Sequence, residues 1–123
     1  MQLRVVALGG RVALQKCDDE GVWSHVSIQR CETIKSGIYT LHNASAPVPS
    51  RFYSGSVLAE HEGILYQLVD GSRVVRHAAP AEIKLAVGDK VQLDYSTGMS
   101  RPTATLIQKS PVLKRTRIMS KKG

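Results

Sequence analysis

Residues 63–77 of the chain read GILYQLVDGSRVVRH. Two runs rich in aliphatic and β-branched residues, 64–69 and 73–77, lie on either side of Asp70-Gly71, a dipeptide typical of tight hairpin turns. Both runs are too short to be stable helices. The stretch therefore predicts two antiparallel strands joined by a turn.

Similar short runs, separated by Gly, Asp, Ser and Pro, occur along the rest of the chain and predict further strands. Within 52–60, Gly55 indicates a bulge or a close approach of another backbone. In 91–95 apolar and polar residues alternate, as in a half-buried strand. The other predicted strands are 11–16 and 22–28, which form a hairpin around the loop 17–21, and then 37–41 and 103–107.

Strands spaced every 8–12 residues predict an all-β fold, a small partly open β-barrel or roll of SH3-like size. The Ala-rich segment 78–83 predicts one short helical turn. We expect one domain over residues 1–108 and a flexible basic tail over 109–123. The two prolines of 43–50 mark an internal boundary, with a second portion over 51–108.

Several segments between residues 37 and 98 occur in a characteristic order: GIYTL at 37–41, YSGSVL at 53–58, YQ at 66–67, VVRH at 74–77, VGDKV at 87–91 and DYSTG at 94–98. This pattern resembles the KfrB-like domain of conjugative plasmids and integrative elements. The resemblance implies an accessory role in plasmid maintenance or DNA transfer and no catalytic activity. Ala78-Ala79-Pro80 departs from the more polar segment expected at that point of the pattern.

The net charge of +7 comes entirely from the C-terminus. Residues 1–100 hold ten basic and ten acidic side chains, whereas 101–123 hold seven basic residues and no acid. Such a segment attracts phosphate backbones because each neutralised phosphate releases counterions. The predicted nucleic-acid-binding residues are Arg101, Lys109, Lys114, Arg115, Arg117, Lys121 and Lys122, with Arg73, Arg76 and Lys90 as contributors from the folded body.

Two other interpretations of the tail remain open: a solubilising terminus, or a segment bound to an acidic protein. Stacking of bases on exposed aromatic rings would add to nucleic-acid binding. By alternation Tyr66 and Tyr95 face the core, whereas Trp23 lies opposite the aliphatic face formed by Val22, Val26 and Ile28. Trp23 is therefore the aromatic residue that we expect to be most exposed.

Motifs for catalysis or metal binding are not evident. Cys17 and Cys31 are 14 residues apart without the paired spacing of a zinc site, and a site of these two with His25 lacks a fourth ligand. His61 lies between Glu60 and Glu62 in a predicted turn, where the carboxylates point away from the ring. We therefore expect no enzyme, cofactor or metal, and two reduced thiols in a cytoplasmic protein without a membrane span.

Together these observations predict a non-enzymatic accessory protein of a mobile element that binds the backbone of DNA or RNA. The alternative is an adaptor that docks on a plasmid transfer or partition protein through a sheet edge. An exposed edge would also allow a homodimer to form by strand pairing.

Overall fold

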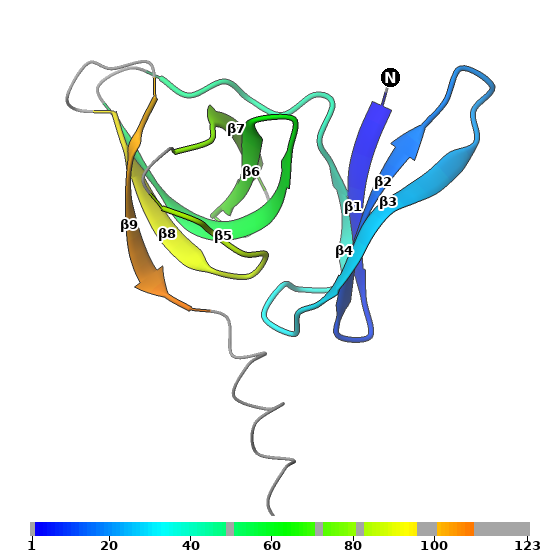
Figure 1. The fold of residues 1–123 in the computed structure, drawn as a ribbon, viewed down its shortest axis with the longest axis horizontal. Helices are drawn as coiled ribbons and strands as arrows, with labels where there is room; N and C mark the ends of the chain where they lie inside the picture. The colour runs from blue at the N-terminus through cyan, green and yellow to red at the C-terminus, as the bar shows by residue number, and fades with distance from the viewer. Residues whose placement is uncertain (1, 49–50, 71–72, 81–82, 96–100, 110–123) are drawn as a thin grey trace, which may run out of the picture.

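A computed structural model describes residues 2–48, 51–70, 73–80, 83–95 and 101–109. The described residues form nine strands in two antiparallel sheets and no helix. Figure 1 shows the two sheets side by side, with the second curled upon itself. The predicted all-β class is confirmed, and the strands do not close into a barrel.

The N-terminal sheet contains β1 (Gln2–Leu8), β2 (Arg11–Cys17), β3 (Trp23–Arg30) and β4 (Gly37–Thr40), in the order β3-β2-β1-β4. The C-terminal sheet has the order β7-β6-β5-β8-β9. Its strands are β5 (Phe52–His61), β6 (Ile64–Val69), β7 (Arg73–Ala78), β8 (Lys90–Asp94) and β9 (Thr103–Gln108).

The main core lies between the two sheets. Alternate residues of β1 and β2, among them Val5 and Leu14, pack with Leu58, Tyr66 and Leu68 of the C-terminal sheet. The other face of the C-terminal sheet lies inside its curl and is also buried. Strand β6 consequently has apolar residues on both faces and is a nearly continuous apolar run, whereas β8 alternates between buried apolar and less buried polar residues.

The sequence analysis did not predict β1, although this strand lies inside its sheet between β2 and β4. Gln2–Leu8 alternates strictly between buried and less buried residues. Such alternation is typical of a half-buried strand. Gly9 and Gly10, both with positive φ, form the turn that returns the chain into β2.

The expected helical turn over 78–83 is not confirmed. Ala78 ends β7, Ala79, Pro80 and Ile83 have no helical conformation, and residues 81–82 lie outside the described part of the chain. The tail is described only as far as Lys109. In the expected boundary segment, Ser45 forms a parallel bridge with Val75 and so lies along the open edge of β7.

Gly55 confirms the predicted close backbone approach. A Cβ atom at this position would lie 2.0 Å from the carbonyl oxygen of Leu68 on the neighbouring strand. The irregularity in pairing between β5 and β6 falls further on, between Val57 and Ala59. Only glycine therefore fits at this position of β5 without a shift of the backbone, and the bulge is a separate feature.

Strand β3 differs from the expected orientation. Its aliphatic residues Val26 and Ile28 are 39% and 55% exposed, whereas Ser27 faces the other sheet beside Leu14 and Leu58. Trp23 is only partly exposed, because the guanidinium of Arg4 lies 3.9 Å from its ring centroid. The physical reason is that β3 is an edge strand. Its inward-facing residues lie beside the second sheet but are not part of the main core.

Candidate nucleic-acid interface

The structure separates the basic residues predicted on the folded body. Arg73 and Arg76 lie on β7, at one edge of the C-terminal sheet, whereas Lys90 lies on β8, three strand positions away. Three strand spacings correspond to about 14 Å. Arg76 also donates a hydrogen bond to the carbonyl oxygen of Ala44, and Arg73 lines a groove between β4 and β7. The three residues do not form one patch.

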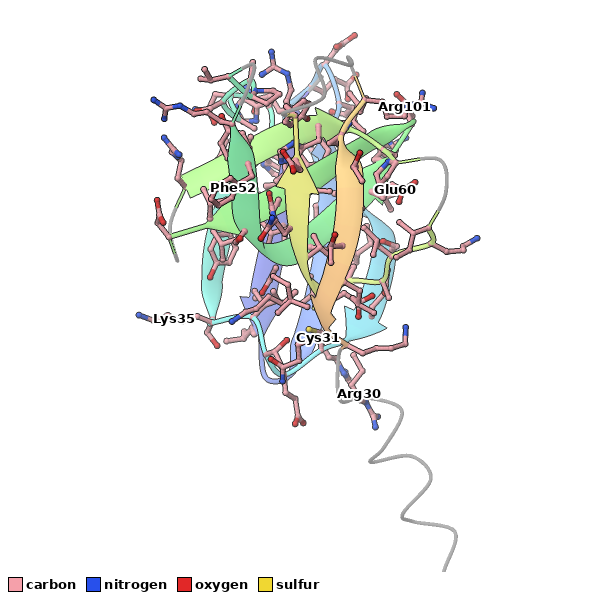
Figure 2. The ribbon with its side chains drawn as sticks, turned by 90° about the vertical axis from the view of Figure 1, so that its left-hand side faces the viewer. Arg30, Cys31, Lys35, Phe52, Glu60 and Arg101 are labelled. Carbon is pink, nitrogen blue, oxygen red and sulfur yellow. The ribbon has the colours of Figure 1, made fainter. Side chains whose placement is uncertain are left out.

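Arg101 and Lys109 lie at opposite ends of β9. Eight residue steps separate them, which in an extended strand is about 26 Å. Figure 2 shows Arg101 at one end of the molecule, while β9 finishes at the opposite end, the end at which Arg30 and Cys31 lie. The remaining predicted basic residues, Lys114, Arg115, Arg117, Lys121 and Lys122, lie outside the described residues.

A basic groove lies at the end of the molecule where β9 finishes. Its volume is about 360 Å³, and its walls include Lys35, Lys90 and the hydroxyl-bearing Thr33, Ser54 and Ser56. Lys90 pairs with Gln108, the residue immediately before Lys109. Lys90 thus lies beside the start of the basic C-terminal segment, and Lys35 belongs to the wall formed by the segment between β3 and β4. We call this feature the lysine groove.

The lysine groove also contains one acid and a small backbone surface. Asp70 lines it together with Gly55 and Leu68, so the groove combines two lysines with one carboxylate. Sequence reasoning missed Lys35, because the segment between β3 and β4 carries no recognisable motif. Lys35 lines the groove because its neighbour Ile34 packs into the core and holds this segment against the second sheet.

Aromatic side chains offer little surface for base stacking. Tyr66 and Tyr95 are buried, as predicted, and Tyr53 is buried with them. One face of the Trp23 ring is occupied by Arg4. Phe52, which is 64% exposed and visible in Figure 2, is the most exposed ring among the described residues. Phosphate contacts are therefore better supported than contacts to bases.

A buried polar network inside the curl of the C-terminal sheet is the most unusual cluster of titratable groups. His77 is 2% exposed, and its two ring nitrogens lie 2.7 Å from the Tyr95 hydroxyl and 3.0 Å from Oε1 of Gln67. Burial lowers the pKa of His77 to about 4. Burial, with a smaller contribution from Tyr53, raises the pKa of Tyr95 to about 12. Both groups are uncharged at neutral pH.

This network is closed to a substrate. The Nε2 amide of Gln67 donates to the carbonyl oxygens of Tyr53 and Val91 at 3.2 and 3.0 Å, and it lies 3.4 Å from that of Gly55. Every ring nitrogen of His77 already has a partner. A general base must reach the proton that it removes. The network consequently stabilises the packing of the C-terminal sheet and the register of its strands.

Other reactive side chains are dispersed. Cys17 and Cys31 are both buried free thiols. His61 ends β5, and its Nε2 lies 3.6 Å from the carboxylate of Glu62. The expectation that both carboxylates point away from the ring is therefore wrong for Glu62, because the positive φ of this residue turns the chain after the strand. Across the described ranges, no three His, Cys, Asp or Glu side chains are grouped closely enough to hold a metal ion. The same ranges contain no helix with the length and apolar character needed to cross a membrane.

Comparison with known proteins adds no assignment: no family model matches the chain, and no curated protein matches its sequence.

Proposed function

We propose that this protein binds the phosphate backbone of nucleic acid through its basic C-terminal segment, assisted by the lysine groove. Concentration of the whole net charge in residues 101–123 is the observation that carries the proposal. Seven cations without an acid make an electrostatic contact that needs no defined base-reading geometry.

The described residues support a contact that extends onto the folded body. Lys90 pairs with Gln108 at the end of β9, next to Lys109, and shares the lysine groove with Lys35. A backbone held by the segment would therefore pass close to the groove lysines. The hydroxyls of Ser54 and Ser56 add donors suited to phosphate oxygens.

The setting that we propose is a conjugative plasmid or a similar mobile element, where the protein would act in maintenance or DNA transfer. Its support is the resemblance of residues 37–98 to the KfrB-like domain. The described residues of that pattern fall on or beside β4, β5, β6, β7 and β8. The protein would be a non-enzymatic accessory component of the cytoplasm, and DNA or RNA would be its partner.

A second candidate is the adaptor that pairs with a transfer or partition protein, or with a second copy, through a sheet edge. It is favoured by β3 and β9, the outer strands of their sheets, which have no strand partner among the described residues on one side. Leu106 and Ile107 of β9 are also exposed. The two candidates differ in their dependence on the tail cations.

Fluorescence anisotropy with labelled duplex DNA, single-stranded DNA and RNA at several salt concentrations tests the proposal. If all seven C-terminal cations contact duplex phosphates, we expect them to contribute about −6 to the log–log salt slope. The full chain carrying glutamine at Lys114, Arg115, Arg117, Lys121 and Lys122 keeps two of the seven. Its slope should be less negative than that of the natural chain by about 4.5.

The groove is tested by Lys35→Gln/Lys90→Gln, with Lys16→Gln/Lys84→Gln as the matched control. All four lysines are exposed, and each double variant removes two charges. We expect weaker binding and a slope less negative by about 2 for the groove variant only. No binding by the full chain near physiological salt would overturn the nucleic-acid proposal and leave the adaptor.

A further inference from the structure

No described strand packs on the second face of the N-terminal sheet. Its inner face, with Val5 and Leu14, packs against the C-terminal sheet, and the residues between these positions point away from the core. We call this side the outer face. Figure 1 shows it on the side of the molecule away from the curled sheet.

An aliphatic row crosses the outer face from edge to edge. The register pairs Ile38 with Val6, Val6 with Ala13, and Ala13 with Ile28, so one residue from each strand falls in line. The end residues Ile38 and Ile28 are 64% and 55% exposed. Single exposed aliphatic residues are common on protein surfaces, but a row spanning four strands marks an interaction surface.

Arginines flank this row on both sides. Arg4 precedes Val6 on β1, and Arg11 and Arg30 lie directly opposite each other beyond Ala13 and Ile28. Strands β1 to β4 contain no Asp or Glu. The carboxylate of Glu32 lies beside Gly10, at the end of the face where Arg11 and Arg30 meet, so two arginines face one acid there. Like charges opposite each other on a sheet are destabilising unless an anion lies near them.

We propose that the outer face docks an acidic amphipathic helix of a partner protein, lying across the four strands. Neighbouring strands are about 4.8 Å apart, close to the 5–6 Å between side chains three or four positions apart on a helix. A helical apolar stripe thus matches the aliphatic row. Acidic residues beside the stripe would lie over Arg4 on one side and over Arg11 and Arg30 on the other.

Charge and chemistry favour this occupant over three others. The chain's own C-terminus carries seven cations and no acid, and a second copy of the face would bring arginine onto arginine. Nucleic-acid bases stack on aromatic rings, whereas this row is aliphatic, and Arg4 covers the Trp23 ring. An acidic partner supplies the charge that the face lacks. The inference does not depend on the proposed nucleic-acid binding.

The test uses the full chain and a synthetic 18-residue peptide with leucines at alternating spacings of three and four and glutamates on both flanks. Two control peptides replace every glutamate by lysine, or every leucine by glutamine. Binding is followed by the fluorescence of Trp23, the single tryptophan, and by amide chemical shifts of β1, β2 and β3. We expect saturable binding of the acidic peptide alone, with shifts confined to the outer face.

Exposed residues allow substitutions that leave the core intact. Ile28→Ser/Ile38→Ser should weaken binding by roughly a hundredfold, because two anchoring side chains are lost. Arg11→Glu/Arg30→Glu should weaken it by tenfold or more, with a reduced salt dependence. The matched control is Val48→Ser/Phe52→Ser, which removes two exposed apolar side chains elsewhere and should leave binding unchanged.

Three results would overturn the proposal. The first is absence of saturable peptide binding, and the second is equal binding of the lysine-flanked peptide. The third is displacement of the same amide signals by a DNA or RNA oligonucleotide, which would assign the face to nucleic acid. The five-glutamine tail variant should bind the acidic peptide as the natural chain does, so loss of the tail's function and failure of the helix proposal are distinguishable.

Discussion

Gln67 and His77 are directly hydrogen-bonded inside the C-terminal sheet, with Oε1 of Gln67 3.0 Å from Nε2 of His77. The amide of Gln67 is oriented by the backbone carbonyls that it faces, so Oε1 must accept and Nε2 of His77 must carry the proton. The other ring nitrogen, Nδ1, then accepts from the Tyr95 hydroxyl. The network therefore selects one neutral tautomer of His77.

Stability should depend on pH through His77. Its pKa is lowered to about 4 in the folded protein, whereas an unfolded histidine titrates near 6.5. As the pH falls through this window, the unfolded chain takes up a proton that the folded chain excludes. The contribution is fully present above pH 6.5 and is lost on approaching pH 4, a decrease of about 3 kcal/mol in the free energy of unfolding.

Urea unfolding between pH 4.5 and 7.5, followed by the fluorescence of Trp23, measures this decrease. In His77→Gln the part of the pH dependence due to this histidine should disappear, whereas the exposed control His25→Gln should retain it. Parallel pH profiles for His77→Gln and the natural protein would show that folding does not lower the pKa of His77.

Gly55 should be far less replaceable than a glycine in an open turn. In Gly55→Ala the new Cβ meets the Leu68 carbonyl oxygen at 2.0 Å, and only movement of β5 or β6 relieves the overlap. We expect a loss of more than about 3 kcal/mol. Gly21→Ala is the control: Gly21 has φ of 83° and no heavy atom within 4 Å of the added Cβ. Its cost should be about 1 kcal/mol.

Chemical denaturation of the two glycine variants gives the comparison directly. Similar losses for Gly55→Ala and Gly21→Ala would mean that the strands separate easily at this point. That result would contradict the tight pairing of β5 and β6.

Arg4 should control the environment of Trp23. Its guanidinium lies 3.9 Å from the ring centroid, and its Nε donates to Gln15 at 2.7 Å. Arg4→Gln should shift the emission of Trp23 to longer wavelength and cost at most about 1 kcal/mol. Arg11→Gln on the same face should leave the emission unchanged. An unshifted spectrum in Arg4→Gln would mean that the two side chains do not stack in solution.

The strands were largely predictable because their signals are local. Asp70-Gly71, the alternation in 91–95 and the valines of 73–77 each specify a strand or turn within a few residues. The arrangement of two sheets was not predictable, since it depends on which faces are buried. Val26 and Ile28 follow a normal pattern for an inward face, yet the edge position of β3 leaves them exposed.

The basic residues show the same division between local and long-range information. The net charge of the C-terminal segment follows from counting its residues. The positions of the basic side chains on the folded body do not follow from such a count. Lys35 and Lys90 are 55 positions apart in sequence and line one groove, whereas Arg101 and Lys109 are separated by the length of β9. Strand pairing determines which cations meet, and no pattern within either segment encodes it.

The position of β9 determines where the basic segment can be removed without damaging the fold. Five residues of β8 pair with β9, and Ala104 packs against the cluster that contains Val91 and Leu93. Removal of residues 101–123 would expose the paired edge of β8. We expect the 1–100 chain to be several kcal/mol less stable and to associate through this edge. The 1–109 chain should unfold within about 0.5 kcal/mol of the natural protein, because its last residue is exposed.

Urea unfolding and sedimentation velocity of the two truncated chains test this difference. Loss of nucleic-acid binding in the 1–109 chain can then be attributed to the missing cations, whereas loss in the 1–100 chain also reflects the damaged sheet. Equal stability of the two chains, with both monomeric, would mean that β9 does not belong to the folded unit. In that case Lys109 would not be held beside Lys90, and the lysine groove would lose its connection to the basic segment.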